Sequence, residues 1–205
     1  MQCLLKAARR CTGSITIGRV EFVGLGQRMG ILTAEAKCVG LWVAKCFDFV
    51  SNMSKLTIRS LAELEAYVGR ELGASELHTV TQEQINQFAT ATLDFQWIHT
   101  DPARAQVESP FQATIAHGYL TVALLPYLWQ QIVAIENLKM QVNYEIESLR
   151  FNQAVTVNSQ VRLRASLLSV ANLRGIAKTR VGVTLEIEGS KKPAYAGVVT
   201  FLYHF

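Results

Sequence analysis

Hydrophobic and polar positions alternate over much of the last third of the chain, a period typical of β-strands. Four segments there are rich in Val, Leu, Ile, Thr and Tyr, and clusters of Asn, Gly and Pro separate them. The pattern predicts strands over residues 140–151, 160–170, 175–188 and 194–203. Long strands joined by short turns favour an antiparallel sheet.

The region before these strands has the 3.6-residue period of helices. A capping box, Ser60 with Glu63 three residues on, predicts a helix over residues 60–68. A similar start at Thr81 predicts a second helix that ends near Asp94.

A third helix is expected to begin at residues 117–118 and to be apolar nearly all round, and therefore buried. Pro126 within it removes a backbone donor and crowds the carbonyl of Val122, so a kink is expected there. A buried helix followed by four strands predicts an α+β fold in which an antiparallel sheet wraps the helix.

Charge changes this picture little. The chain has a net charge of +4, but residues 53–205 hold 13 basic and 13 acidic residues. The excess lies in residues 1–52, and no basic stripe runs through the patterned region, which argues against nucleic-acid binding. No apolar run approaches the roughly 18 residues that a membrane span needs. We therefore expect a soluble, cytoplasmic protein.

Residues 1–52 differ from the rest in composition and contain all four cysteines. The cysteine spacing forms no paired C-x-x-C knuckles, so free thiols are favoured over zinc ligands or disulfides. We expect a domain over residues 53–205 and a poorly ordered N-terminal extension over 1–52. An organellar transit peptide and translation assigned from an upstream Met are the alternatives for this extension.

Asp94 and His99 are the candidate acid/base pair. Asp94 lies where the second helix should end, His99 follows across a short segment, and Asp101-Pro102 then requires extended or turn backbone. A carboxylate and an imidazole that converge can hold and polarise one water. On spacing alone, the alternative is a helix-terminal Asp and a surface His that never meet.

Gly118 offers an unpaired N–H at the start of the third helix, where a carbonyl oxygen that gains negative charge could be stabilised. Equally, a glycine there could simply allow tight packing. His117 could contact a substrate or could have a structural role. Trp97, Phe111 and Tyr119 could line an acyl tunnel or belong to the core.

Several of these motifs together resemble the MaoC-like dehydratases, the (R)-specific enoyl-CoA hydratase family. The resemblance rests on Asp94-x-x-x-x-His99, Asp101-Pro102, Ser109-Pro110-Phe111 and Ile115-Ala-His-Gly118-Tyr-Leu, and covers about residues 53–205. Gln96-Trp97-Ile98 is similar to the branch that includes nodulation protein N.

The resemblance implies a hot-dog fold, a long central helix wrapped by an antiparallel sheet, usually as a homodimer. It implies a hydratase/dehydratase that interconverts 2-enoyl and (R)-3-hydroxyacyl thioesters of coenzyme A or a carrier protein. It further implies catalysis by Asp94 and His99 without a metal or other cofactor, with the Gly118 N–H on the thioester oxygen. We expect His99 to be the base towards water. The residues expected to bind substrate are Gln96, Trp97, Phe111, His117 and Tyr119.

Two departures from the family pattern bear on activity. Leu93 precedes Asp94 where many members have Gly, and Gln112-Ala113 stands where relatives often have small residues. Leu93 could narrow the water pocket or tilt Asp94, and Gln112 could restrict access of the acyl chain. Leu93 is the feature that favours a non-catalytic acyl-binding module as an alternative. A hot-dog thioesterase, which would use water to cleave the thioester itself, is a second alternative.

Overall fold

The structure, a computed structural model, describes residues 55–205. The predicted extension over residues 1–52 and the predicted domain start at residue 53 lie outside the described residues. In chain order, the described elements are β1 (Leu56–Ile58), α3 (Leu61–Glu65), β2 (Glu71–Ala74), β3 (His78–Thr79), α4 (Gln82–Thr92), α5 (Trp97–Thr100), α6 (Pro102–Glu108), α7 (Gly118–Ala123), α8 (Leu125–Ile132), β4 (Val133–Ile135), β5 (Met140–Phe151), β6 (Gln160–Leu173), β7 (Ile176–Ile187) and β8 (Tyr195–His204).

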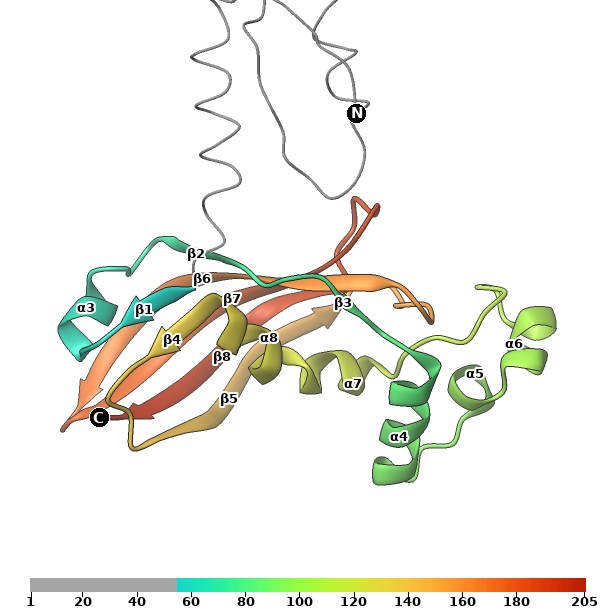
Figure 1. The fold of residues 1–205 in the computed structure, drawn as a ribbon, viewed down its shortest axis with the longest axis horizontal. Helices are drawn as coiled ribbons and strands as arrows, with labels where there is room; N and C mark the ends of the chain where they lie inside the picture. The colour runs from blue at the N-terminus through green and yellow to red at the C-terminus, as the bar shows by residue number, and fades with distance from the viewer. Residues whose placement is uncertain (1–54) are drawn as a thin grey trace, which may run out of the picture. The chain divides into compact units, whose positions relative to one another are not determined.

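An antiparallel sheet forms one layer, and α7 and α8 run along one of its faces (Figure 1). The strand order is β2-β6-β7-β8-β5, and β3 also pairs with β6. The four long strands lie where the alternation predicts them, with ends within a few residues of the expected ones. This arrangement confirms the predicted α+β hot-dog fold.

The inward face of the sheet packs on α8. Along β7, every second residue from Ala177 to Leu185 is buried, as the alternation predicts. Trp129 of α8 stacks on Phe201 of β8 with ring centroids 5.4 Å apart. Burying side chains of this size contributes about 1.5–3 kcal/mol each to folding.

The third predicted helix differs from expectation in one respect. The helix is interrupted near the proline, because Leu124 separates α7 from α8 two residues before Pro126. The helix is not buried all round: Leu128 and Trp129 are in the core, but Tyr119 and Tyr127 are exposed. The helices α7 and α8 therefore also carry apolar side chains on a face that points away from the core and is exposed in this chain.

The first predicted helix is shorter than expected. Ser60 caps it by accepting the N–H of Glu63, but α3 ends at Glu65 and the chain continues in turns to Gly69. Thr81 caps α4 in the same way, and that helix ends at Thr92.

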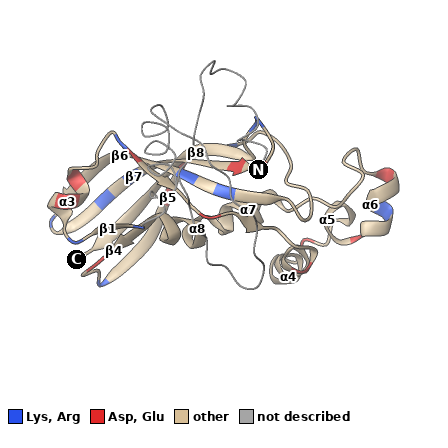
Figure 2. Cartoon of the chain, turned by 45° about the horizontal axis from the view of Figure 1, so that its top comes forward, with Lys and Arg blue, Asp and Glu red and all other residues tan. Residues whose placement is uncertain are grey.

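Charged side chains of both signs are spread over the described sheet and helices (Figure 2). Arg162 of β6 pairs with Glu186 of β7 at 2.6 Å, and Lys178 of β7 pairs with Glu145 of β5 at 3.5 Å. No helix within residues 55–205 is both long and apolar enough to cross a bilayer.

Candidate active site

Four segments beside the sheet converge on the predicted acid/base pair. Helix α4 ends at Thr92, and Leu93 then adopts a left-handed backbone conformation with φ 61°. Asp94 follows at once, and α5 presents His99 one turn later. The loop before α7 brings Ile115 against α5, since the Ile115 N–H donates to the Ile98 carbonyl at 3.0 Å.

His99 is 7% exposed, and its ring is held by the backbone of this loop. Its Nδ1 lies 2.7 Å from the Ile115 carbonyl oxygen. A carbonyl can only accept, so Nδ1 carries the proton and Nε2 keeps a free lone pair. Burial lowers the pKa of His99 below 6.5, opposed by the Ile115 hydrogen bond and assisted by His117. His99 is therefore neutral at pH 7 and has the protonation state of a base.

Asp94 lies beside this imidazole with its side chain 56% exposed. One side-chain atom each from Asp94, His99 and His117 lie within 4.8 Å of one another. The structure thus brings the predicted pair together and adds the second histidine. The alternative in which Asp94 and His99 never meet does not hold.

His117 is 3% exposed and contacts both members of the pair. Its Nε2 donates to the main-chain oxygen of Asp94 at 2.9 Å and lies 3.9 Å from the Asp94 carboxylate. Its ring stacks on that of His99 with centroids 3.8 Å apart and planes at 26°. Phe88 of α4 packs against it as well, with centroids at 5.1 Å.

Gly118 opens α7 at the surface, and no side chain caps the first N–H groups of that helix. A β-carbon at this position would meet the Phe151 ring at 3.1 Å, tighter than ordinary contact. The packing reason for a glycine therefore holds. The N–H of Gly118, the first helical residue, also has no acceptor within the helix. Gly118 can therefore both allow tight packing and offer its N–H to a carbonyl oxygen.

The other residues expected to bind substrate lie at α5, after α6 and at the start of α7. Gln96 is exposed and its carbonyl accepts the His99 N–H at 2.9 Å. Trp97 is half-buried under the Arg104 guanidinium, 4.4 Å from the ring centroid. Phe111 and Tyr119 are exposed, and Tyr119 meets Phe151 edge-on at 6.3 Å.

The two departures from the family pattern share a backbone feature. Leu93 and Gln112 both have positive φ, 61° and 53°, a conformation in which glycine avoids a cost of about 1–2 kcal/mol. The backbone at Leu93 and Gln112 thus has the left-handed conformation that favours glycine, although neither residue is a glycine. Leu93 is 79% exposed.

Sequence reasoning did not identify Gln82, which links three segments of the site. Its Nε2 donates to the His99 carbonyl at 2.8 Å, and its Oε1 accepts from the hydroxyl of Thr114, which is 1% exposed. Gln82 therefore joins α4 to α5 and to the loop that holds the His99 ring. A glutamine in the first turn of a helix carries no sequence signal for this role.

Replacing Gln82 by Leu is expected to lower the free energy of unfolding by about 1–3 kcal/mol, because the buried Thr114 hydroxyl loses its acceptor. Urea denaturation measures the change. Gln87→Leu on the same helix is the matched control, since the exposed Gln87 amide contacts only Glu83, at 3.3 Å. Equal losses in the two variants would show that the link through Gln82 is not needed.

Comparison with known proteins gives a consistent result. The family model described as MaoC like domain matches residues 63–188. The 3-hydroxyacyl-thioester dehydratase Z of Mycobacterium tuberculosis is 46% identical over 139 residues, which are 67% of this chain and 91% of that protein. Nodulation protein N of Rhizobium leguminosarum bv. viciae is 44% identical over 138 residues, 66% of this chain and 85% of that protein.

Solved structures share the fold. An R-hydratase from Pseudomonas aeruginosa superposes with a TM-score of 0.57 at 20% identity, covering 70% of this chain and 84% of that one. An (R)-hydratase from A. caviae has a TM-score of 0.54 at 22% identity, covering 65% of this chain and 94% of that one.

Proposed function

The chain belongs to the MaoC-like dehydratase family, and on this premise we propose that it interconverts 2-enoyl and (R)-3-hydroxyacyl thioesters by addition or removal of water. The observation that carries the proposal is the convergence of the Asp94 carboxylate with an imidazole, His99, whose Nε2 is free. The relative at 46% identity, named as a 3-hydroxyacyl-thioester dehydratase, supports the substrate class.

In the hydration direction, Asp94 and His99 hold one water between them. His99 Nε2 accepts a proton as the water oxygen bonds to C3. The C2=C3 electron pair moves towards the thioester oxygen, and the Gly118 N–H stabilises the resulting enolate. C2 then takes up one proton from the pair as the carbonyl re-forms, so the pair gains one proton and returns one.

The donor pattern at the site supports chemistry without a metal. Two histidines and a carboxylate could hold a transition metal. However, His117 Nε2 donates to the Asp94 carbonyl and His99 Nδ1 donates to the Ile115 carbonyl. His117 Nδ1 keeps a lone pair but is buried without a partner among the described residues. His99 Nε2 and the Asp94 carboxylate are the other acceptors left free, and these two suit one water.

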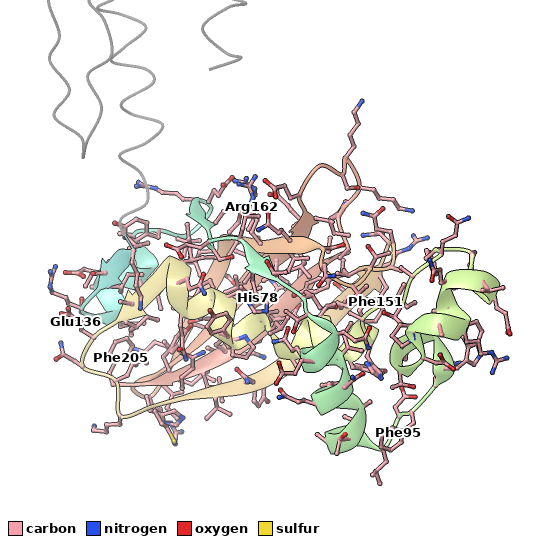
Figure 3. The ribbon with its side chains drawn as sticks, turned by 45° about the vertical axis from the view of Figure 1, so that its right-hand side comes forward. His78, Phe95, Glu136, Phe151, Arg162 and Phe205 are labelled. Carbon is pink, nitrogen blue, oxygen red and sulfur yellow. The ribbon has the colours of Figure 1, made fainter. Side chains whose placement is uncertain are left out.

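Leu93 was the feature that favoured a non-catalytic acyl-binding module. Its side chain is largely exposed, and the left-handed backbone at this residue leads the chain directly into Asp94. Phe95, on the other side of Asp94, also points outward at the turn between α4 and α5 (Figure 3). In this chain, neither neighbour fills the space between Asp94 and His99.

The test is an assay of the full chain with crotonyl-CoA and longer 2-enoyl-CoA thioesters. Loss of enone absorbance without release of free thiol, with an (R)-3-hydroxyacyl product by chiral chromatography, supports the proposal. Thiol release would identify a thioesterase instead. Neither reaction over short to long acyl chains would favour the acyl-binding module.

We propose further that the protein is a homodimer paired along β5. This strand is at the edge of the sheet, bonded to β8 on one side only. It exposes Met140, Tyr144, Ile146 and Phe151. A cavity of about 210 Å³ lies between this strand and α7 and α8. A 12-residue edge strand that carries four exposed apolar side chains is a surface that soluble proteins normally cover.

Replacing Ile146 by Lys is expected to convert the dimer to a monomer, because the partner strand would have to bury a charge. Size-exclusion chromatography with light scattering measures the mass. Leu173→Lys is the control, since Leu173 is similarly exposed but lies at the β6–β7 turn. A wild-type protein that is monomeric at all concentrations would contradict the β5 interface.

A further inference from the structure

His117 is buried where ordinary packing would not need a histidine. It directly precedes α7, is 3% exposed, and lies between Phe88 of α4 and the His99 ring. A phenylalanine or leucine could fill such an apolar space. The polar atoms of His117 therefore need an explanation of their own.

The hydrogen bonds of His117 are unequal. Nε2 donates to the main-chain oxygen of Asp94, so the proton is on Nε2 and Nδ1 has only a lone pair. That Nδ1 is buried without a partner among the described residues. An unsatisfied buried polar atom costs about 1–3 kcal/mol. The fold accepts this cost at a residue that touches both members of the proposed pair.

The bond to Asp94 holds a segment with few other attachments. Asp94 follows a left-handed residue, and its side chain and both neighbouring residues are exposed. Among the described hydrogen bonds, the one from His117 is the bond that reaches Asp94. The same ring lies flat against His99. One buried side chain therefore sets the position of the carboxylate relative to the imidazole.

We propose that His117 is a positioning residue for the Asp94–His99 pair, a role that rests on the proposed function. It acts through the Asp94 main chain and through ring stacking on His99, and it does not contact the reacting atoms. A displacement of about 1 Å within such a pair can lower turnover about 10²-fold.

Two substitutions separate the N–H donor from the packing. His117→Phe keeps an aromatic ring against His99 but cannot donate to Asp94. His117→Gln offers an amide N–H at a reach similar to that of Nε2. With crotonyl-CoA as substrate, we expect His117→Phe to lower kcat about 10²-fold while KM changes little. The His117→Gln variant should keep most of the wild-type kcat.

His78→Phe is the matched control. His78 is a second histidine and is half-buried, but it contacts Gln84 at 3.1 Å and Tyr127 edge-on. Figure 3 shows it well apart from Phe95, the residue that follows Asp94. The His78→Phe variant should leave kcat unchanged. If His117→Phe keeps the wild-type kcat, or if Gln and Phe lose it equally, the proposal is overturned.

A second measurement does not depend on turnover. NMR relaxation of the Asp94 amide is expected to show increased motion in His117→Phe and wild-type behaviour in His117→Gln. An unchanged Asp94 amide in the Phe variant would overturn the positioning role even if wild-type activity were absent. Inactive wild-type protein with a mobilised Asp94 in the Phe variant would instead refute only the hydratase function.

Discussion

Replacing either Asp94 or His99 by Ala is expected to lower kcat for hydration of crotonyl-CoA by about 10²–10⁴-fold, the usual contribution of one positioned acid/base group. In the proposed mechanism Asp94 and His99 each supply one acceptor to the water, so removing either residue leaves the water with a single partner. Steady-state kinetics with the full chain measure the loss. Circular dichroism checks that both variants stay folded.

Asp101→Ala is the matched control for a carboxylate in the same motif. The Asp101 side chain accepts the Arg104 N–H at 3.0 Å and caps α6, so its loss should cost about 1 kcal/mol of stability and little activity. Activity of the Asp94 or His99 variant within tenfold of wild type would remove that residue from the pair.

The pH dependence gives the same prediction a second signature. Because burial lowers the pKa of His99, the imidazole stays neutral down to a pH below 6.5. The rate of hydration should therefore change little with pH near pH 7, where His99 is already neutral, and should fall as the pH drops through that lowered pKa, where Nε2 becomes protonated. This acidic limb should be absent from the residual activity of His99→Ala.

The sheet could be predicted from the sequence because each of its four long strands carries its own signal. Alternation over 10 or more residues and turn residues between the segments place β5 to β8 within a few residues. Strands β1 to β4 were not predicted. They are two to four residues long, and their pairing depends on contacts such as Leu56 with Val133, far apart in sequence.

The site was predictable where the chemistry lies in a local motif and not where it depends on main-chain contacts. Asp94 and His99 are five residues apart, so one tight connection brings them together. The bond from His117 to the Asp94 carbonyl and the links through Gln82 join residues 17 to 32 positions apart. No spacing rule indicates which carbonyl a buried side chain will reach.

The departures at residues 93 and 112 show the same limit. Sequence comparison with the family pattern suggested that Leu93 could obstruct the site. The structure instead places this leucine in a left-handed helix cap with its side chain outward. The glycine preference at both positions follows from backbone conformation, which a single sequence does not display.

Replacing Gly197 by Ala is expected to lower the free energy of unfolding by at least about 3 kcal/mol, since large losses follow overpacking that side chains cannot relieve. Gly197 of β8 faces Leu149 of β5. A β-carbon there would clash with the Ser148 carbonyl oxygen and lie 2.8 Å from the Leu149 α-carbon. Both atoms are backbone, so β5 has to move away from β8. Because β5 carries Phe151 against Gly118, the displacement should also reduce hydration.

Gly182→Ala separates this steric effect from the general cost of changing a glycine in a strand. Gly182 also lies inside the sheet, on β7, but its β-carbon would meet only the Leu168 side chain at 3.5 Å, an ordinary contact. Adding a methyl group there should change stability by less than about 1 kcal/mol, and the lower chain entropy of alanine favours the folded state. Urea denaturation of both variants distinguishes the two. If Gly197→Ala and Gly182→Ala had equal free energies of unfolding, β5 would not lie close enough to β8 at Gly197 to exclude a β-carbon, and the prediction would be wrong.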